Sequence, residues 1–442
     1  MYEKPHQSST YIIHTSLLFN SRTLKFDTDQ SITVNPKTGR IVSVTPTPPN
    51  LSHVSYPDLD LRGCTVLPGF VDAHAHVFVH PYTETPALNQ ERDESLTERV
   101  LRAGNNAKAG LKAGFTTYRD LGTEGAFNAD IGVRDAISRG IIPGPRLFVA
   151  TEALASTGGY EIRHENKIGG TSVPRLSDVC DGVDGVKMGV RRRLGAGADV
   201  IKFYAEYRRR TLRFPQPAWP GSQSIRYPPY ATGGGNAILS SMNPPSTLFD
   251  QEEMNAIVQT AKRAKCPVAS HASSPEAVIM ASNAGVTSIE HGSLPSEESL
   301  KAMKKNDTIY VPTLCVADIE LDDKEFRKAI LGHARKANEM GIRLATGGDT
   351  GESAHGNNVR ELELFLEAGI SLEDTLRAAT LGGWEACGGD WCGYRSGWVG
   401  EGWQADLVVL GGDLREDQGA LRRVEMVIKD GNVVVDGGFI IE

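Results

Sequence analysis

Residues 68–76 read Pro68-Gly69-Phe70-Val71-Asp72-Ala73-His74-Ala75-His76, an apolar segment that ends in two histidines separated by one residue. Successive side chains of a β-strand point to opposite faces, so His74 and His76 are predicted to project from the same face. Two imidazoles on one face at the end of a strand can share a metal ion. Four more candidate ligands follow along the chain, and each closes an apolar, strand-like segment: Lys202, His271, His291 and Asp349.

The middle of the chain alternates apolar strand-like segments with amphipathic helix-like segments. The predicted strands are Val66–His76, Phe115–Leu121, Arg146–Thr151, Ala198–Tyr204, Pro267–His271, Thr287–His291, Thr308–Thr313 and Arg343–Gly347. The helix-like stretches include Leu96–Ala113, Gly185–Leu194, Gln251–Ala264, Pro275–Ala284, Glu297–Lys305 and Asp323–Met340. This alternation predicts an α/β fold, a (β/α)8 TIM barrel, in which functional side chains sit at the C-terminal ends of the strands. All six candidate ligands lie at or just past such ends.

Both ends of the chain lack the strand–helix alternation of the middle and show a pattern of short strands and turns instead. The strand candidates there are Tyr11–Asn20, Ser31–Val34, Ile41–Thr45, Ala405–Leu410, Val424–Lys429 and Asn432–Val435, with a hairpin signal at Asp430-Gly431. We therefore expect a discontinuous β-sandwich domain built from residues 1–66 and 391–442, and a barrel that spans residues 67–390.

Composition narrows the class of protein. The 442 residues carry 47 Lys and Arg against 55 Asp and Glu, a net charge of −8, which disfavours nucleic acid as a partner. No run approaches the ~18 apolar residues of a membrane-spanning helix. The polar start lacks the apolar core of a signal peptide, so we expect a cytoplasmic protein without a membrane partner. The six cysteines have no Cys-x-x-Cys spacing and are expected to be reduced thiols rather than disulfides or a zinc knuckle.

Lys202 needs a separate explanation, because a charged, unpaired lysine at the end of an apolar barrel strand would cost several kcal/mol. Burial lowers the pKa of such an amine and makes it neutral and nucleophilic. It can then capture carbon dioxide, and the two oxygens of the resulting carbamate can bridge two metal ions. The alternatives are a lysine that pairs with a nearby carboxylate and a lysine that forms Schiff bases. Four histidines and an aspartate at neighbouring strand ends weigh against both.

Together these motifs resemble the amidohydrolase superfamily. They are Gly69–His76, Ile201-Lys202, Ser270-His271-Ala272, Ser288-Ile289-Glu290-His291-Gly292, Gly347-Gly348-Asp349-Thr350 and, near the C-terminus, Gly402-Trp403-Gln404-Ala405-Asp406-Leu407-Val408. The resemblance extends over nearly the whole chain. The most similar branch is the imidazolonepropionase-like and Xaa-Pro dipeptidase (prolidase-like) group, which also contains ochratoxinase-type amidases.

The resemblance implies a role for each candidate ligand. It implies that His74, His76 and Asp349 hold a buried metal, that His271 and His291 hold a more exposed one, and that N6-carboxylated Lys202 bridges the two. The implied cofactors are two divalent metal ions, with Zn²⁺ the expected metal. The implied reaction is hydrolysis of an amide C–N bond in a small dipeptide-like or N-acyl amino acid substrate by a metal-bridging hydroxide, with Asp349 as general base.

The segment Ser156-Thr157-Gly158-Gly159-Tyr160 departs from the family pattern. Related dipeptidases usually carry Thr-Gly-Gly-His here, and that histidine contacts the substrate. A phenol can donate a hydrogen bond but supplies no positive charge, which argues against a strictly carboxypeptidase-like specificity. His164 or the arginines after Lys202 are candidates to compensate. Tyr160, Tyr204, Tyr207 and His355 are candidate substrate contacts, and ordinary loop packing is the alternative for all of them.

The long connection from Glu206 to Phe249 leaves the barrel next to Lys202 and is expected to cover the site as a lid, with a solvated excursion or a subunit contact as alternatives. We expect a small-molecule amide as the partner and assembly into a homo-oligomer. Two rival classes remain at this point. A non-hydrolytic lyase, decarboxylase or isomerase would use the same ligands, whereas a non-catalytic scaffold conflicts with six intact ligand positions.

Overall fold

Two parallel sheets carry the middle of the chain in the computed structural model, which describes residues 10–160, 173–208, 245–320 and 324–441. The first sheet contains β5 (Phe70–Ala75), β6 (Phe115–Asp120) and β7 (Arg146–Val149). The second contains, in spatial order, β15 (Ile309–Val311), β14 (Ser288–His291), β13 (Val268–Ala272), β10 (Ile201–Tyr204), β8 (Ala153–Ala155) and β9 (Ser177–Val179).

Hydrogen bonds outside the named strands join the two sheets on both sides. On one side the amides of Asp199 and Val200, just before β10, donate to the carbonyl of Val149 at 2.8 and 3.3 Å. On the other side residues 343–350 lie between β15 and β5. The amide of Tyr310 donates to the carbonyl of Arg343 at 2.8 Å, and the amide of Ala73 donates to the carbonyl of Thr346 at 2.9 Å. The predicted ring of parallel strands is therefore closed by backbone hydrogen bonds.

The predicted strand Arg343–Gly347 is not a regular strand, although its backbone bonds to both neighbours. It makes only an isolated bridge, between Leu344 and Tyr310. A Cβ atom on Gly347 would lie 2.6 Å from the amide nitrogen of His74, so this segment approaches β5 more closely than any side chain would allow. The close approach brings the following Asp349 next to His74.

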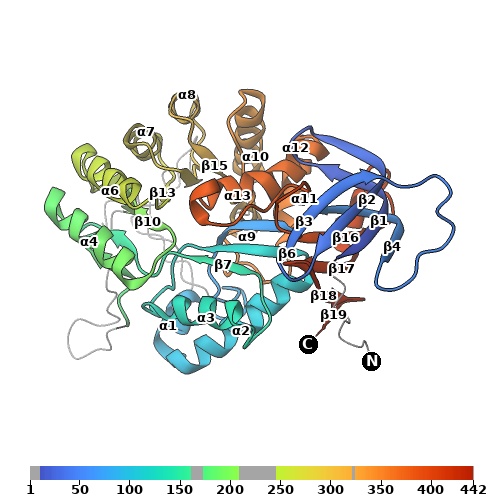
Figure 1. Cartoon of the computed structure of the whole chain (residues 1–442). Coiled ribbons are helices and arrows are strands. Elements are labelled where there is room, and N and C mark those ends of the chain that lie inside the picture. Colours follow the sequence, from blue (N-terminus) through green and yellow to red (C-terminus); the bar gives the residue numbers. More distant parts are fainter. Residues whose placement is uncertain (1–9, 161–172, 209–244, 321–323, 442) are drawn as a thin grey trace.

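Helices surround the sheets (Figure 1). They are α1 (Ala87–Asp93), α2 (Leu96–Lys112), α3 (Ala129–Ser138), α4 (Gly182–Ala196), α6 (Gln251–Arg263), α7 (Pro275–Ala284), α8 (Glu297–Lys305), α9 (Leu314–Glu320), α10 (Lys324–Glu339), α11 (Val359–Glu367), α12 (Leu372–Arg377) and α13 (Gly383–Ala386). A side chain caps the start of α2, α6, α7, α8 and α12. At α6, the Asp250 side chain accepts from the Glu253 amide while the Glu253 side chain accepts from the Asp250 amide. The predicted helices are confirmed to within three residues at each end.

Strands from the two chain ends pair with each other in one β module. The first strands, in blue, and the last strands, in red, lie side by side (Figure 1), with β4 parallel to β1 and antiparallel to β16. The strands are β1 (Tyr11–Asn20), β2 (Lys25–Asn35), β3 (Arg40–Pro46), β4 (Leu59–Pro68), β16 (Leu407–Gly411), β17 (Val424–Lys429), β18 (Asn432–Asp436) and β19 (Phe439–Ile440). They form one continuous eight-stranded sheet, in the order β19-β18-β17-β16-β4-β1-β2-β3, rather than two distinct sheets.

Alternating side chains place this terminal sheet between two apolar clusters. Val66, Leu407 and Val409 belong to a cluster formed by the module itself. Their neighbours in sequence, Leu67 and Val408, pack in the cluster that also holds Phe70 of the barrel. Because side chains alternate between the two faces of β4 and β16, one face packs within the module and the other packs against the barrel.

The predicted strand Val66–His76 is in fact two strands. β4 ends at Pro68 and belongs to the terminal sheet, whereas β5 begins at Phe70 and belongs to the barrel. The chain turns at Gly69, where a Cβ atom would lie 2.2 Å from the hydroxyl of Thr116. The exact limits of the two domains stay a prediction.

Two sequence-based expectations concern the chain as a whole. All six cysteines are free thiols in this structure. Across the described ranges, no helix combines the length and apolar character needed to cross a bilayer.

Candidate metal centre at the end of β5

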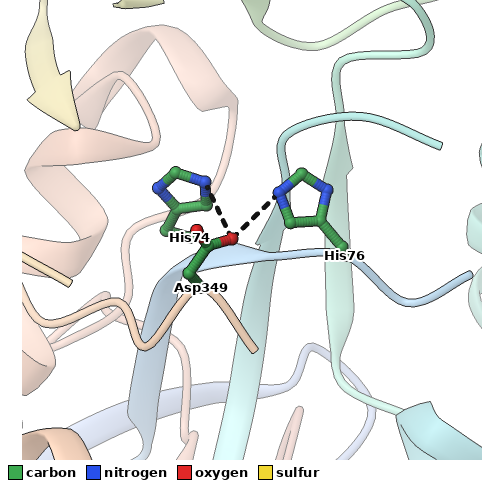
Figure 2. A group of neighbouring side chains, drawn as sticks. All are labelled: His74, His76 and Asp349. Carbon is green, nitrogen blue, oxygen red and sulfur yellow. Dashed lines mark ion pairs between the residues drawn. The ribbon is translucent and has the colours of Figure 1, made fainter. Parts of the chain in front are cut away.

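Three side chains meet where β5 ends (Figure 2). Oδ1 of Asp349 lies 3.4 Å from Nε2 of His74 and 3.1 Å from Nε2 of His76. One ligand atom from each of the three residues falls within 4.8 Å of the others, and all three side chains are buried. The prediction that His74 and His76 share a face is therefore confirmed.

The spacing of these atoms fits a metal ion. A zinc ion holds nitrogen and oxygen ligands at about 2.0–2.2 Å, so two ligands of a tetrahedral site lie about 3.3–3.6 Å apart. The distances from Asp349 to the two imidazoles are close to that separation. Two neutral imidazoles and a carboxylate are also the donor types that zinc prefers.

The other ring nitrogen of His74 contacts a buried ion pair. Nδ1 of His74 lies 3.0 Å from Oε2 of Glu290, and Oε1 of Glu290 accepts from Arg119 at 2.8 Å. Arg119 and Glu290 are both fully buried, and Arg119 also donates to the carbonyl of Ala73. Because the carboxylate accepts from Nδ1, Nε2 of His74 keeps its electron pair free to ligate a metal ion.

His76 has the same arrangement with a backbone partner. Its Nδ1 lies 2.8 Å from the carbonyl oxygen of Gly122, which can only accept, so Nδ1 carries the hydrogen. Burial acts to lower the pKa of His76, but the hydrogen bond and charge of Asp349 outweigh it and raise the pKa to about 10. Burial lowers the pKa of His74 well below its ordinary value. A divalent cation at this point would replace the proton that His76 and Asp349 share.

Lys202 lies on β10 and is 2% exposed. Burial lowers its pKa to about 8, against the opposing charges of Glu290 and Asp349. In the described part of the chain, no carboxylate oxygen lies within 4.0 Å of its ammonium nitrogen. The alternative of a direct lysine–carboxylate pair therefore finds no partner among these residues.

His271 and His291 stand on the next strands of the same sheet. Tyr204 of β10 is in register with His271 of β13, and Ala272 is in register with His291 of β14. The ring centroids of His271 and His291 are 4.6 Å apart, and those of His291 and His74 are 5.0 Å apart. Nδ1 of His291 contacts the Thr313 hydroxyl at 2.9 Å. The structure thus brings all four histidines and Asp349 together.

Unusual backbone conformations accompany these residues. His291, Asp349 and Glu124 have φ angles of 73°, 51° and 47°, in the left-handed region that non-glycine residues seldom adopt. Such conformations persist when the surrounding structure enforces them, and they gather at functional sites.

The candidate substrate contacts form an aromatic wall beside His271. The ring of Tyr160 lies 4.5 Å from that of Tyr204 and 5.2 Å from that of Tyr207, and Tyr204 lies 5.0 Å from His271. His355 is placed differently, because its Nε2 contacts the carbonyls of Val79 and His76 at 3.1 and 3.3 Å. It supports the loop that follows β5. A substrate contact for any of the four stays a prediction.

Two sequence hypotheses fall largely outside the described residues. His164 is outside them, and so are positions 209–244, which hold most of the predicted lid and its aromatics. The two ends of that connection are described: β11 (Glu206–Arg208) pairs antiparallel with β12 (Pro245–Thr247).

Sequence reasoning missed Arg119, Glu290 and Glu124. Glu290 stands between two residues of a quoted motif, and a charged residue one position before a strand-end histidine was a usable signal. Arg119 is a charged residue inside an apolar strand, which indicates a buried partner. Glu124 lies in a loop and gave no signal in the sequence.

Comparison with known proteins agrees with the resemblance to amidohydrolases that the sequence motifs indicate. A family model described as "Amidohydrolase family" matches residues 65–434. Ochratoxinase from Aspergillus niger is 26% identical over 384 residues, which cover 80% of this chain and 71% of that protein.

Two solved structures resemble the chain along almost its whole length. A Xaa-Pro dipeptidase with methionine bound in its active site is 29% identical, with a TM-score of 0.75 over 96% of this chain and 99% of that one. A prolidase in complex with N-methylphosphonate-L-proline is 26% identical, with a TM-score of 0.75 over 97% of this chain and 100% of that one. These folds are TIM barrels with a small additional domain. The chain belongs to the amidohydrolase family and is a hydrolase that acts on carbon–nitrogen amide bonds.

Proposed function

We propose that this protein is a binuclear metal-dependent amidohydrolase that cleaves an amide bond in a small dipeptide-like or N-acyl amino acid substrate. One observation carries the proposal. A buried His74–His76–Asp349 group, spaced as metal ligands are, lies next to His291 and His271 and to a buried lysine whose pKa is lowered to about 8.

The residues divide into two ligand groups. His74, His76 and Asp349 would hold the first ion, and His271 and His291 the second, with carboxylated Lys202 shared between them. A lysine amine with a pKa near neutrality reacts more readily with carbon dioxide than an ordinary lysine does. When bound, two Zn²⁺ ions supply Lewis acidity that lowers the pKa of water and polarises the scissile carbonyl.

Asp349 is the general base of this proposal. Burial opposes its ionisation, but the hydrogen bond and charge of His76 hold its pKa well below the ordinary value, so the carboxylate is ionised at neutral pH. It can accept the proton of the attacking water and return it to the nitrogen of the leaving amine. The Glu290 and Gly122 contacts keep both neighbouring imidazoles oriented during this transfer.

The substrate class rests on relatives and on the aromatic wall. A dipeptidase holding methionine, a prolidase holding a proline phosphonate and an ochratoxinase all resemble this chain. Tyr160, Tyr204 and Tyr207 border one side of the site at ring separations of 4.5 and 5.2 Å, which suits a small, partly apolar molecule.

Hydrolysis in ¹⁸O-labelled water tests this function. Protein stripped with a chelator should be inactive, and reloading with Zn²⁺ should restore cleavage of at least one member of a panel of dipeptides and N-acyl amino acids. The carboxylic acid product should carry one ¹⁸O atom from the solvent. A product formed without ¹⁸O would instead indicate a lyase, decarboxylase or isomerase. Failure to turn over any amide would also contradict the proposal.

A further inference from the structure

Glu124 brings a carboxylate to the edge of the metal centre. It follows β6 in the loop that also carries Gly122, and its side chain bonds to both tyrosines of the aromatic wall. The hydroxyl of Tyr160 donates to Oε2 at 2.5 Å, and the hydroxyl of Tyr204 lies 3.5 Å from Oε1. A Cβ atom built on Gly122 would lie 3.6 Å from Oε1 of Glu124 and 3.8 Å from Cε1 of His76. The carboxylate and the ligand imidazole therefore border the same small space.

Arg99 holds the loop that carries Glu124 through its backbone, so the Glu124 carboxylate has a fixed position. Arg99 of α2, which is buried, donates to the backbone carbonyl of Thr123 at 3.0 Å and to that of Glu124 at 2.7 Å. These bonds hold the backbone of Glu124 in its left-handed conformation. The guanidinium thus supports the loop through carbonyl oxygens and leaves the side-chain oxygens to the tyrosines.

In the described part of the chain Glu124 forms no salt bridge with a lysine or arginine, although its charge acts on the pKa of His76, Arg99 and Lys202 from a greater distance. Within the described ranges, no lysine or arginine nitrogen lies within 4.0 Å of its carboxylate, although the residue is only 7% exposed. Two phenol hydroxyls satisfy hydrogen bonds but do not neutralise charge. A carboxylate this far from water is costly unless an opposite charge approaches it.

The hydrogen bond to Glu124 determines where the Tyr160 hydroxyl points. A histidine at that position could carry positive charge toward the substrate. Here the Tyr160 hydroxyl gives its hydrogen to Glu124, so it is not directed at a substrate carboxylate. Among the described residues, the Glu124 carboxylate therefore makes the aromatic wall of Tyr160 and Tyr204 negatively charged.

We propose that Glu124 is a specificity-determining residue that binds a cationic group, such as an ammonium, carried by the amide substrate close to the scissile bond. The proposal rests on the amide-hydrolase function above and narrows its substrate class. An ammonium between Glu124 and the rings of Tyr160 and Tyr204 would gain a charge-assisted hydrogen bond and contact with two aromatic faces. The competing explanation is that Glu124 only fixes the two tyrosines in place.

Two series of amides separate these explanations. Each series has one scissile bond and a chain of fixed length that ends in an ammonium, a methyl or a carboxylate group. For the first series, β-alanyl, butanoyl and malonyl amides of one amine are suitable, because they place the three end groups close to the scissile bond. The second series places the same three ends on the amine side. The measured quantity is the ratio of kcat/KM for the ammonium substrate to that for the methyl substrate.

The side of the amide that faces Glu124 decides which of the two series responds. In that series the wild-type protein should prefer the ammonium substrate over the methyl substrate and discriminate against the carboxylate substrate. Glu124→Gln should reduce the ammonium-to-methyl ratio about 10- to 100-fold, as expected for loss of a hydrogen bond between charged groups. Tyr160→Phe keeps the carboxylate and should keep the preference. Glu401→Gln makes the same change at an exposed position and should leave the ratio as in the wild type.

A second measurement does not depend on the Glu124 variant folding. A quaternary alkylammonium ion, which cannot ligate a metal, should inhibit the wild-type protein at least about 10-fold more tightly than its neutral carbon isostere. Equal inhibition would overturn the proposal. An unchanged ammonium-to-methyl ratio in Glu124→Gln would also overturn the proposal. In that case kcat/KM would fall equally for all three end groups, as expected if Glu124 only holds the tyrosines in place. If the zinc-loaded wild type hydrolyses no amide of either series or of the dipeptide panel, the proposed function itself fails, and this inference fails with it.

Discussion

Each histidine of the centre that has a described partner is oriented through its Nδ1 atom. His74 contacts Glu290, His76 contacts a backbone carbonyl, and His291 contacts Thr313. The residues that meet at this centre could be picked out from the sequence, because they follow apolar strands and because His74 and His76 are two residues apart. Their supporting partners were harder to predict, because Arg119 and Glu290 stand out in the sequence as charged residues in apolar strands but their contacts form only when the barrel closes.

At this scale we predict that Asp349→Asn keeps the fold and loses turnover. An amide oxygen can still occupy a ligand position weakly, but it cannot accept the proton of the attacking water. The expected loss in kcat is ~10²–10⁴-fold. Steady-state kinetics of the zinc-loaded variant, with circular dichroism to check the fold, provide the measurement. Asp184→Asn, at a side chain that is 96% exposed, is the matched control. Turnover near that of the wild type would require another base.

Lys202→Ala tests the shared carbamate. The variant should lose activity and part of its metal, because the bridging oxygens are missing. Short-chain carboxylic acids such as propionate should restore part of the activity by supplying two oxygens at the same place, and they should have no effect on Lys305→Ala, which changes an exposed lysine. Full activity of Lys202→Ala without added acid would contradict a bridging role.

At the scale of elements, the sequence predicted most strands and helices but misplaced two strands. Alternation and capping are local signals, so α6 and β1 were placed within a residue of their observed ends. Val66–His76 was read as one strand because both halves are apolar, and only the register against β16 and β6 divides it. Residues 343–350 bond to both neighbours through an irregular backbone that no periodicity describes.

Glu361 gives an element-scale prediction. Its carboxyl group accepts from the amides of Leu314 and Cys315, the first residues of α9, at 2.9 Å each. Burial raises its pKa to about 8 from 4.5, against these two hydrogen bonds. Because the folded state holds this proton more tightly than the unfolded state, the contribution to stability is fully present below pH 4.5. It is lost as pH rises through about 8.

Comparison with Glu361→Gln isolates this contribution. The difference in unfolding free energy, wild type minus variant, should fall between pH 5 and 8 with a slope of up to about 1.4 kcal/mol per pH unit. Denaturant titrations at several pH values measure it, with Glu401→Gln as the control for an exposed glutamate. A difference that does not change with pH would show that Glu361 is ionised in the folded protein.

At the scale of the molecule, a buried ion pair joins the barrel to the terminal sheet. Arg146, at the start of β7, donates to Asp406 at 2.6 Å and to Asp430 at 2.5 Å. Asp406 precedes β16 and its side chain is 1% exposed. These contacts connect the two parts of the chain that the sequence predicted as separate modules. Assembly into a homo-oligomer and a cytoplasmic location stay predictions.

Arg146→Met should destabilise the whole protein by about 3–5 kcal/mol, because it leaves the Asp406 carboxylate buried without its partner. Urea unfolding followed by tryptophan fluorescence gives the free energy of unfolding. The double variant Arg146→Met with Asp406→Asn removes the stranded charge and should recover part of the loss. A cost below about 1 kcal/mol for the single variant would mean that the pair behaves like an exposed one.

If this chain holds two metal ions, its activity should depend on the number of ions bound. Metal-free protein should be titrated with Zn²⁺ in the presence of bicarbonate, which supplies carbon dioxide for Lys202. Bound metal is then measured by elemental analysis and amide hydrolysis is assayed at each step. We predict that activity rises until two zinc ions are bound per chain and that Lys202→Ala falls short of this number. Full activity with one ion or none per chain would contradict the account.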